Sequence, residues 1–346
     1  MGWMAPLRHL GAKVLVGRNR REFITLLGGA VAAWPLAARA QQPAMPVVAF
    51  VTPSERDSFP PRYVAAFRKG LSDTGYIEGQ NVSVEYHWLE GRYDRLPALM
   101  ADLVRRQVAV IATPGGSLAA LAAKAATATI PIVFGVAENP VSTGLVANLA
   151  RPGGNATGIN FFLGEVVAKR LGLLHELVPK AVRLGVLVNP ANGLTAEATL
   201  RDIPEAARTL GLQVQVLKAS TGPEIDAGFS AMVRDRADAL FIAPDAFFVS
   251  RRVQFATLAA RDRVPTSCVN REMVEAGLLM SYGVNIADMF LQVGIYTGGI
   301  LKGAKPADLP VLQSTKFEFV INLQTARTLG IEVPPTLLAQ ADVVIE

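Results

Sequence analysis

Small and polar residues follow several predicted strands, and these are the positions where the chain could bind a ligand. The run Thr113-Pro114-Gly115-Gly116-Ser117 comes after a buried strand and before a helix. Its glycines would let the backbone approach an anion closely, and the Ser117 hydroxyl would contact the ligand or cap the helix. A carboxylate bound there would gain roughly 1–3 kcal/mol from charge-assisted hydrogen bonds. The run is no phosphate loop, because no Gly-Lys-Ser/Thr follows it.

Further candidates follow the other strands. Asp245 could accept hydrogen bonds from a ligand ammonium group, with Phe247 as an apolar wall, although Asp245 would equally serve as a helix cap. Arg271 could bind a ligand carboxylate or form an exposed ion pair with Glu272. The complete set of candidate ligand-binding residues is Pro53, Ser54, Thr113, Gly115, Gly116, Ser117, Glu138, Asn139, Asn189, Asn192, Asp245, Phe247, Arg271, Tyr282 and Asn285.

Patterns typical of catalytic or metal sites are sparse. Of the histidines after residue 40, His87 lies in an alternating strand and His175 in a helix, and neither has the spacing of metal ligands. The sequence contains no G-x-S-x-G motif, and the single cysteine, Cys268, lies in an apolar run without a nearby base. We therefore expect no enzymatic activity, no metal and no cofactor.

The elements that must position these residues alternate regularly from residue 46 onward. The first series has strands at 47–52, 81–88, 108–113 and 130–136, and a short helix is expected from Val141. The second has strands at 182–190, 212–219, 237–244, 264–270 and 277–285, with helices at 249–262 and about 287–301 among those that follow them. Strands alternating with helices of about 10–15 residues predict βαβ units and parallel sheets.

Two series of similar length, divided near 153–158, predict two α/β lobes. We assign 46–158 with about 286–312 to the first lobe, and 159–285 with about 313–346 to the second. Periodicity alone leaves the lobe of the C-terminal tail open. In parallel sheets, ligands bind beyond the carboxyl ends of the strands, so the candidate residues would line a cleft between the lobes.

The first 40 residues carry the whole net charge of +5. They contain six of the 34 Lys and Arg and one of the 29 Asp and Glu, which leaves 28 basic and 28 acidic residues after them. The remainder therefore gives no electrostatic basis for nucleic-acid binding. It also contains no apolar run of about 18 residues that would predict a membrane span.

These 40 residues have the pattern of an export signal. A basic start is followed by an apolar stretch from Ile24 to Ala37 and by Ala38-Arg39-Ala40, which predicts cleavage after Ala40. The pair Arg20-Arg21 resembles a twin-arginine signal, although the flanking residues depart from that pattern and general export stays open. We expect a periplasmic protein.

Longer segments resemble the substrate-binding proteins of ABC importers, in the family that includes tryptophan- and tyrosine-type binding proteins. They include "AFRKGLSDTGYIEGQNVSVEY", "GRYDRLPALMADLVRRQVAVIAT", "RPGGNATGINF" and "KRLGLLHELVPKAVRLGVLVNP". The resemblance implies a two-lobed periplasmic-binding-protein fold of type I with three crossings between the lobes and a ligand cleft that closes on binding. Relatives often have Gly-Asp-Pro where this chain has Glu138-Asn139-Pro140. The identity of the ligand therefore stays open.

The resemblance implies a monomeric solute-binding component that delivers a small molecule to an ABC permease in the inner membrane. The expected ligand is an amino acid or an aromatic or small carboxylate. One alternative is a periplasmic sensor that reports ligand occupancy to a membrane signalling partner, and a less favoured one is an exported hydrolase.

Overall fold

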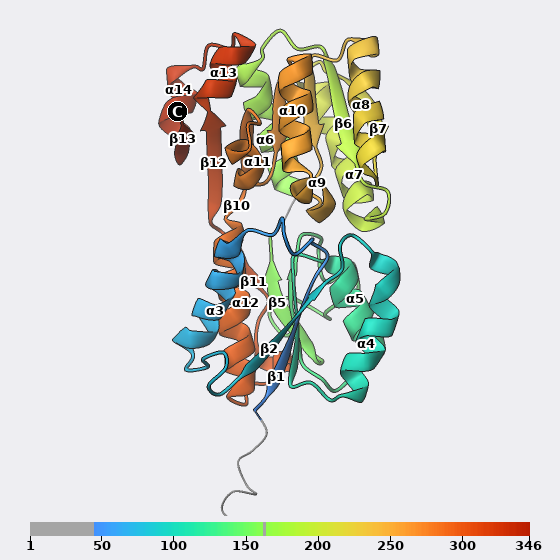
Figure 1. Cartoon of the computed structure of the whole chain (residues 1–346), viewed down its shortest axis with the longest axis vertical. Helices are drawn as coiled ribbons and strands as arrows, with labels where there is room; N and C mark the ends of the chain where they lie inside the picture. The colour runs from blue at the N-terminus through green and yellow to red at the C-terminus, as the bar shows by residue number, and fades with distance from the viewer. Residues whose placement is uncertain (1–44, 162–163) are drawn as a thin grey trace, which may run out of the picture. The chain divides into compact units, whose positions relative to one another are not determined.

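The computed structural model describes residues 45–161 and 164–346, and the expected export signal lies outside these residues. Residues Pro46–Glu346 form one compact unit with two β-sheets whose faces are covered by helices (Figure 1). The predicted α/β fold class is confirmed. No helix in the described ranges is both long and apolar enough to cross a membrane.

The first sheet has six strands in the order β11-β5-β4-β3-β1-β2, all paired in parallel. Both faces are covered, and for this reason β3 and β4 are buried along their whole lengths. In β3, Val110 and Ala112 pack with one helix pair, and Ile111 between them packs with the other. The strands are β1 (Val47–Thr52), β2 (Ser83–Trp88), β3 (Val110–Pro114), β4 (Ile132–Val136), β5 (Ala156–Asn160) and β11 (Leu312–Gln313). The helices are α3 (Pro61–Asp73) and α12 (Ile286–Leu301) on one face, and α4 (Leu96–Arg105) and α5 (Ser117–Ala126) on the other, with 3-10 turns η1 (Tyr93–Arg95) and η2 (Pro306–Asp308).

The second sheet has seven strands in the order β13-β12-β10-β9-β8-β6-β7. Its pairings are parallel except for β10 with β12, which is antiparallel. The strands are β6 (Arg183–Val188), β7 (Gln213–Lys218), β8 (Ala239–Ile242), β9 (Thr266–Cys268), β10 (Met280–Val284), β12 (Phe317–Asn322) and β13 (Val343–Ile345). The helices are α6 (Gly164–Leu177), α7 (Gly193–Thr209), α8 (Gly222–Asp235), α9 (Ala246–Ser250), α10 (Arg252–Asp262), α11 (Arg271–Glu275), α13 (Leu323–Leu329) and α14 (Pro335–Gln340).

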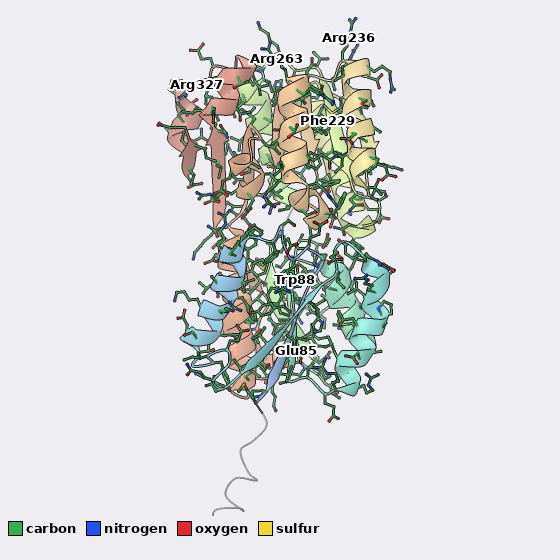
Figure 2. All side chains as sticks on the ribbon, viewed as in Figure 1. Glu85, Trp88, Phe229, Arg236, Arg263 and Arg327 are labelled. Atoms are coloured by element: carbon green, nitrogen blue, oxygen red, sulfur yellow. The ribbon has the colours of Figure 1, made fainter. Side chains whose placement is uncertain are left out.

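Two helices of the second sheet end in the same way. Arg236 after α8 and Arg263 after α10 both adopt the left-handed conformation, with φ of 55°. Figure 2 shows these two arginines at the ends of their helices, where their side chains reach solvent. Phe229, on α8, is 1% exposed and packs in the core between the helices and the sheet. The helices thus end at solvated residues while their apolar faces stay buried.

The chain passes between the sheets at three places. Strands β5 and β6 belong to different sheets, as do β10 and β11, and also β11 and β12. The second and third passages run beside each other. Val284 at the end of β10 pairs with Phe317 of β12, and the Asn285 backbone N–H then donates to the Lys316 carbonyl at 2.8 Å. The Lys316 ammonium group also lies 2.5 Å from the Asp288 carboxylate in α12.

Helices α3 and α12 pack together with almost no side chain between them. A methyl group at Gly70 would collide with the Leu291 carbonyl, and one at Gly294 with the Phe67 carbonyl. Glycine at both positions therefore lets the two backbones touch. The contact fixes α12, which follows the passage from β10, to the first helix of the other sheet.

Two local predictions were wrong. The helix expected from Val141 is a set of turns, in which the Asn139 side chain accepts from the backbone N–H groups of Val141 and Ser142. The helix expected at 249–262 is two helices, α9 and α10, separated at Arg251. Asp245 starts α9 earlier than predicted, because its side chain caps the first turn.

Candidate ligand-binding site

A cavity of about 130 Å³ lies among loops and helix ends that belong to both sheets. Seven of the predicted site residues line it, all of them directly after strands or at the start of helices: Ser54, Gly115, Gly116, Ser117, Glu138, Asn192 and Asp245. The edge formed by the carboxyl ends of parallel strands thus brings residues more than 100 positions apart in the sequence to one place.

Glu138, two residues after β4, joins the two sides of the cavity. One carboxylate oxygen, Oε2, accepts a hydrogen bond from the Ser117 hydroxyl at the start of α5. The other, Oε1, accepts from the Thr195 hydroxyl in α7 at 2.5 Å. Since α5 packs on the six-stranded sheet and α7 follows a strand of the other sheet, this carboxylate links both.

Asp245 also lines the cavity and is 7% exposed. Its carboxylate caps α9 by accepting from the Phe247 and Phe248 N–H groups at 3.0 and 3.2 Å. It also accepts from the side-chain amides of Asn189 and Asn192, both at 3.0 Å. Burial raises the pKa of Asp245, and these four donors act in the opposite direction. The carboxylate that we expected to accept from the ligand is thus already well supplied with donors from the protein.

The first turn of α5 has no side-chain cap. The N-cap is Gly116, and Ser117 is the first helical residue, so the prediction that Ser117 caps this helix was wrong. Gly115 adopts a φ of +82°, which a residue with a Cβ takes only with strain. The N–H groups at the start of a helix have no partner within the helix, so this turn offers donors beside the cavity.

Aromatic rings form much of the remaining lining. Tyr63 of α3 stacks on Phe290 of α12 with centroids 5.0 Å apart, and Phe59 meets the same ring edge-on at 5.7 Å. Tyr93 and Phe161 also line the cavity. Burial, Asp245 and Glu138 all raise the pKa of Tyr93, in that order of size, so its hydroxyl stays protonated at neutral pH. None of these rings was predicted from the sequence. Four of them come from helices and turns rather than strand ends, whereas Phe161 directly follows β5.

Several predicted site residues lie outside this lining, and most of them have structural partners instead. Asn139 orders a turn, and Asn189 bonds to Asp245 and Ser220. Tyr282 stacks on Phe317 with centroids 5.9 Å apart. The others are Pro53, which lies beside Gly116, Thr113, which is fully buried, and Phe247, whose ring lies beside Arg251.

Arg271 and Asn285 line a second cavity of about 220 Å³, which adjoins the main one at Tyr63 and Ile286. The Arg271 guanidinium is paired with Glu275 at 2.7 Å and with Glu318 at 3.3 Å. These partners hold the pKa of Arg271 above its usual value. Asn285 caps α12 by accepting from the Asp288 N–H at 3.0 Å. The geometry therefore favours an ion pair over a carboxylate clamp, but the predicted partner was wrong, because Glu272 pairs with Arg62 instead.

Charged contacts connect the two sheets around the main cavity. Glu272 of α11 accepts hydrogen bonds from Arg62 and from the Tyr63 hydroxyl, both on α3. On another side, Arg251 pairs with Glu55 at 3.2 Å, and Arg252 donates to the Ser58 carbonyl at 2.9 Å. In the part of the chain that the structure describes, no cluster of three or more His, Cys, Asp or Glu is placed to hold a metal ion.

Comparison with known proteins agrees with this arrangement. Residues 47–345 match the family described as ABC transporter substrate binding protein. The chain belongs to this family. Its members are substrate-binding proteins.

Among curated relatives of this ABC transporter substrate-binding protein, the tyrosine-binding protein of Clostridioides difficile (strain R20291) is 26% identical over 269 residues. That match covers 77% of this chain and 76% of the relative. An ABC domain from Streptococcus pneumoniae in complex with L-Trp has a TM-score of 0.78 at 24% identity, covering 87% of this chain and 100% of that one. A conserved domain protein from Vibrio cholerae has a TM-score of 0.78 at 25% identity, covering 87% and 99%. The ligand-free, open form of a substrate-binding protein from Clostridium difficile scores 0.61 at 24% identity, covering 87% and 99%.

Proposed function

We propose that this protein binds a small organic solute, an amino acid or a similar molecule, in the main cavity and delivers it to an ABC permease in the inner membrane. The observation that carries the proposal is the Glu138 carboxylate, held by Ser117 on one side and Thr195 on the other. Because Glu138 is hydrogen-bonded to residues of both sheets, it is well placed to contact a ligand that lies between the sheets. Family membership supports the role in transport.

The size of the cavity limits the ligand. An apolar protein cavity of about 150 Å³ holds one benzene molecule, and the cavity here measures about 130 Å³. The cavity therefore has room for an aromatic or branched aliphatic side chain, which would pack against Tyr63 and Phe290. The names of two relatives, a tyrosine-binding protein and a complex with L-Trp, support an aromatic amino acid.

The backbone at the start of α5 would bind the ligand carboxylate. The first-turn N–H groups after Gly116 have no side-chain cap, and the positive end of the helix dipole favours an anion there. Within this proposal the seven cavity-lining residues named above contact the ligand. Asn189 acts by orienting Asp245.

The proposal includes export and a two-lobed organisation. The expected signal at 1–40 would direct the chain to the periplasm and would be cleaved after Ala40. In the periplasm the protein would act as a monomer. The first lobe would consist of the six-stranded sheet with its helices and the second of the seven-stranded sheet with its helices. The lobes would close over the ligand and exclude water, which strengthens each polar contact.

A thermal-shift screen followed by calorimetry tests this function. Amino acids, aromatic carboxylates, short organic acids and sugars would be added to the purified protein. A ligand at one hundred times its dissociation constant should add about 2.7 kcal/mol of stability. The variant A137W should fill the cavity and abolish the shift, since Ala137 lines it. A227W, on the exposed surface of α8, should leave the shift unchanged. A shift that survives A137W would contradict the proposed site.

A further inference from the structure

The side chains around the main cavity are acidic but not basic. Glu138 and Asp245 line it, and none of its described lining residues is lysine, arginine or histidine. Most other polar groups there are hydroxyls and amides. An anionic ligand would therefore meet two carboxylates and no opposite charge, in surroundings that screen charge less than water does.

The two carboxylates differ in what stabilises them. Asp245 accepts four hydrogen bonds, two of them from backbone N–H groups of α9. Glu138 accepts from two neutral hydroxyls, those of Ser117 and Thr195. Among the described residues, Glu138 takes part in no ion pair within 4.0 Å. Burying a carboxylate without a neighbouring cation costs free energy. The protein supplies no such cation to Glu138, so a positive partner is missing there.

The hydroxyls that could have bound a ligand carboxylate are engaged by Glu138. Ser117 and Thr195 each have one hydroxyl hydrogen. Ser117 donates it to this glutamate, and Thr195 donates it to the glutamate at 2.5 Å, with Asn192 Oδ1 as a longer alternative acceptor at 3.3 Å. Toward a ligand these hydroxyls can therefore only accept. This geometry therefore disfavours the prediction that the Ser117 hydroxyl donates directly to a ligand carboxylate.

Resting on the proposed function, we propose that Glu138 is a specificity-determining residue that requires a protonated amine on the ligand. The ammonium group donates to Glu138 and supplies the missing positive charge between the two carboxylates. The substrate class is then amines and zwitterionic amino acids with an aromatic or branched aliphatic side chain. Carboxylic acids without an amine are excluded.

Calorimetry with matched sets of compounds tests this assignment. Three sets would be used: L-tryptophan, tryptamine and indole-3-propionate; L-tyrosine, tyramine and 3-(4-hydroxyphenyl)propionate; L-leucine, 3-methylbutylamine and 4-methylpentanoate. In the set that binds, the acid without an amine should bind roughly a hundredfold more weakly than the amino acid. The amine without a carboxylate should keep measurable affinity.

Variants at Glu138 separate its charge from its shape. E138Q keeps the size of the side chain and should weaken binding of the amine-bearing compound roughly thirtyfold. The affinity of the amine-free acid should stay the same or rise, so that discrimination collapses. E138D keeps the charge and should keep the preference for amines. E197Q, the same substitution at an exposed position of α7, should change neither.

The outcomes distinguish this assignment from the proposed function. An amine-free acid that binds within about threefold of its amino acid, or discrimination that persists in E138Q with a wild-type melting curve, would overturn the role of Glu138 but leave a solute-binding protein. Absence of binding by every compound, with no effect of A137W on any ligand in the wider screen, would overturn the proposed function and the assignment together.

Discussion

Tyr63 and Glu272 join the two sheets through one hydrogen bond: the hydroxyl of a residue in α3 donates to a carboxylate oxygen in α11. Burial is the main cause that raises the pKa of Tyr63, and the neighbouring Glu272 raises it further, so the phenol stays a donor. The second oxygen of Glu272, Oε2, is buried and has no partner among the described residues. The carboxylate thus depends on Tyr63 and Arg62 for its stabilisation.

The variant Y63F should therefore destabilise the fold by about 1.5–3 kcal/mol, since it removes a buried donor to a charged group. Ring stacking on Phe290 should persist. Urea denaturation measures the loss, and Y296F is the matched control, because the Tyr296 hydroxyl donates to the Pro310 carbonyl at the surface. Equal losses of unfolding free energy in both variants would show that the buried hydrogen bond between the sheets stabilises the fold no more than the surface one does.

Removal of the Asp245 carboxylate should lower stability as well as ligand affinity. D245A leaves the amides of Asn189 and Asn192 and two backbone N–H groups without their acceptor. We expect a loss of about 2–3 kcal/mol, against about 1 kcal/mol for T221A, which removes the solvent-exposed cap of α8. Midpoints of urea unfolding check this difference. Affinity for an amine should also fall at least tenfold, roughly 1.4 kcal/mol, in calorimetry. Loss of affinity with unchanged stability would assign Asp245 to the ligand alone.

Substitution of two glycines in α12 should give effects of opposite sign. G294A would force apart α3 and α12, since the added methyl meets the Phe67 carbonyl, and should cost about 1–3 kcal/mol. G299A adds a methyl with no heavy atom within 4 Å and should stabilise by about 0.5–1 kcal/mol, because alanine favours the helix. Thermal unfolding separates the two. Stabilisation by both would contradict the close contact of the helices.

The single cysteine should be unreactive in the folded protein. Burial raises the pKa of Cys268 to about 12, and its side chain is 1% exposed. A thiol reagent should label it at least about a hundredfold more slowly than the same residue in urea. Rapid labelling of native protein would contradict the buried position.

The raised pKa of Cys268 also predicts that the stability of the protein depends on pH. An acid whose pKa is raised by folding holds its proton more tightly in the native state, so its contribution is complete below the unfolded pKa. That contribution is then lost as the pH rises from about 9 toward about 12. The stability of the wild type relative to C268A should therefore fall across this range. A constant difference would show that the thiol titrates normally.

The fold class and the acidic side of the cavity could be predicted from the sequence. Apolar strands alternating with helices indicate parallel sheets, and ligand sites in such sheets lie at strand ends, where Glu138, Ser117 and Asp245 were found. Thr195 and Tyr63 could not be predicted in the same way. They lie inside helical segments, and only the packing of α7 and α3 decides which of their residues reach the cavity.

Arg271 shows a second limit of the sequence. Its position after β9 and its charge suggested a carboxylate clamp, but Glu318 comes from β12, 47 positions later in the chain. No periodicity reveals that pairing, because it depends on the antiparallel addition of β12 beside β10. The choice between ligand contact and ion pair was therefore a matter of tertiary structure.

The paired passages between β10 and α12 and between β11 and β12 restrict the motion that the two sheets can make. Val284 with Phe317, and Asn285 with Lys316, make these segments a two-stranded ribbon. Sliding one strand past the other would break the ladder of hydrogen bonds in its register, whereas bending the ribbon keeps them. The ribbon therefore favours a hinge rotation of one sheet relative to the other over a sliding motion. Distances between probes placed on the two sheets should change as expected for a rotation about an axis near Asn285.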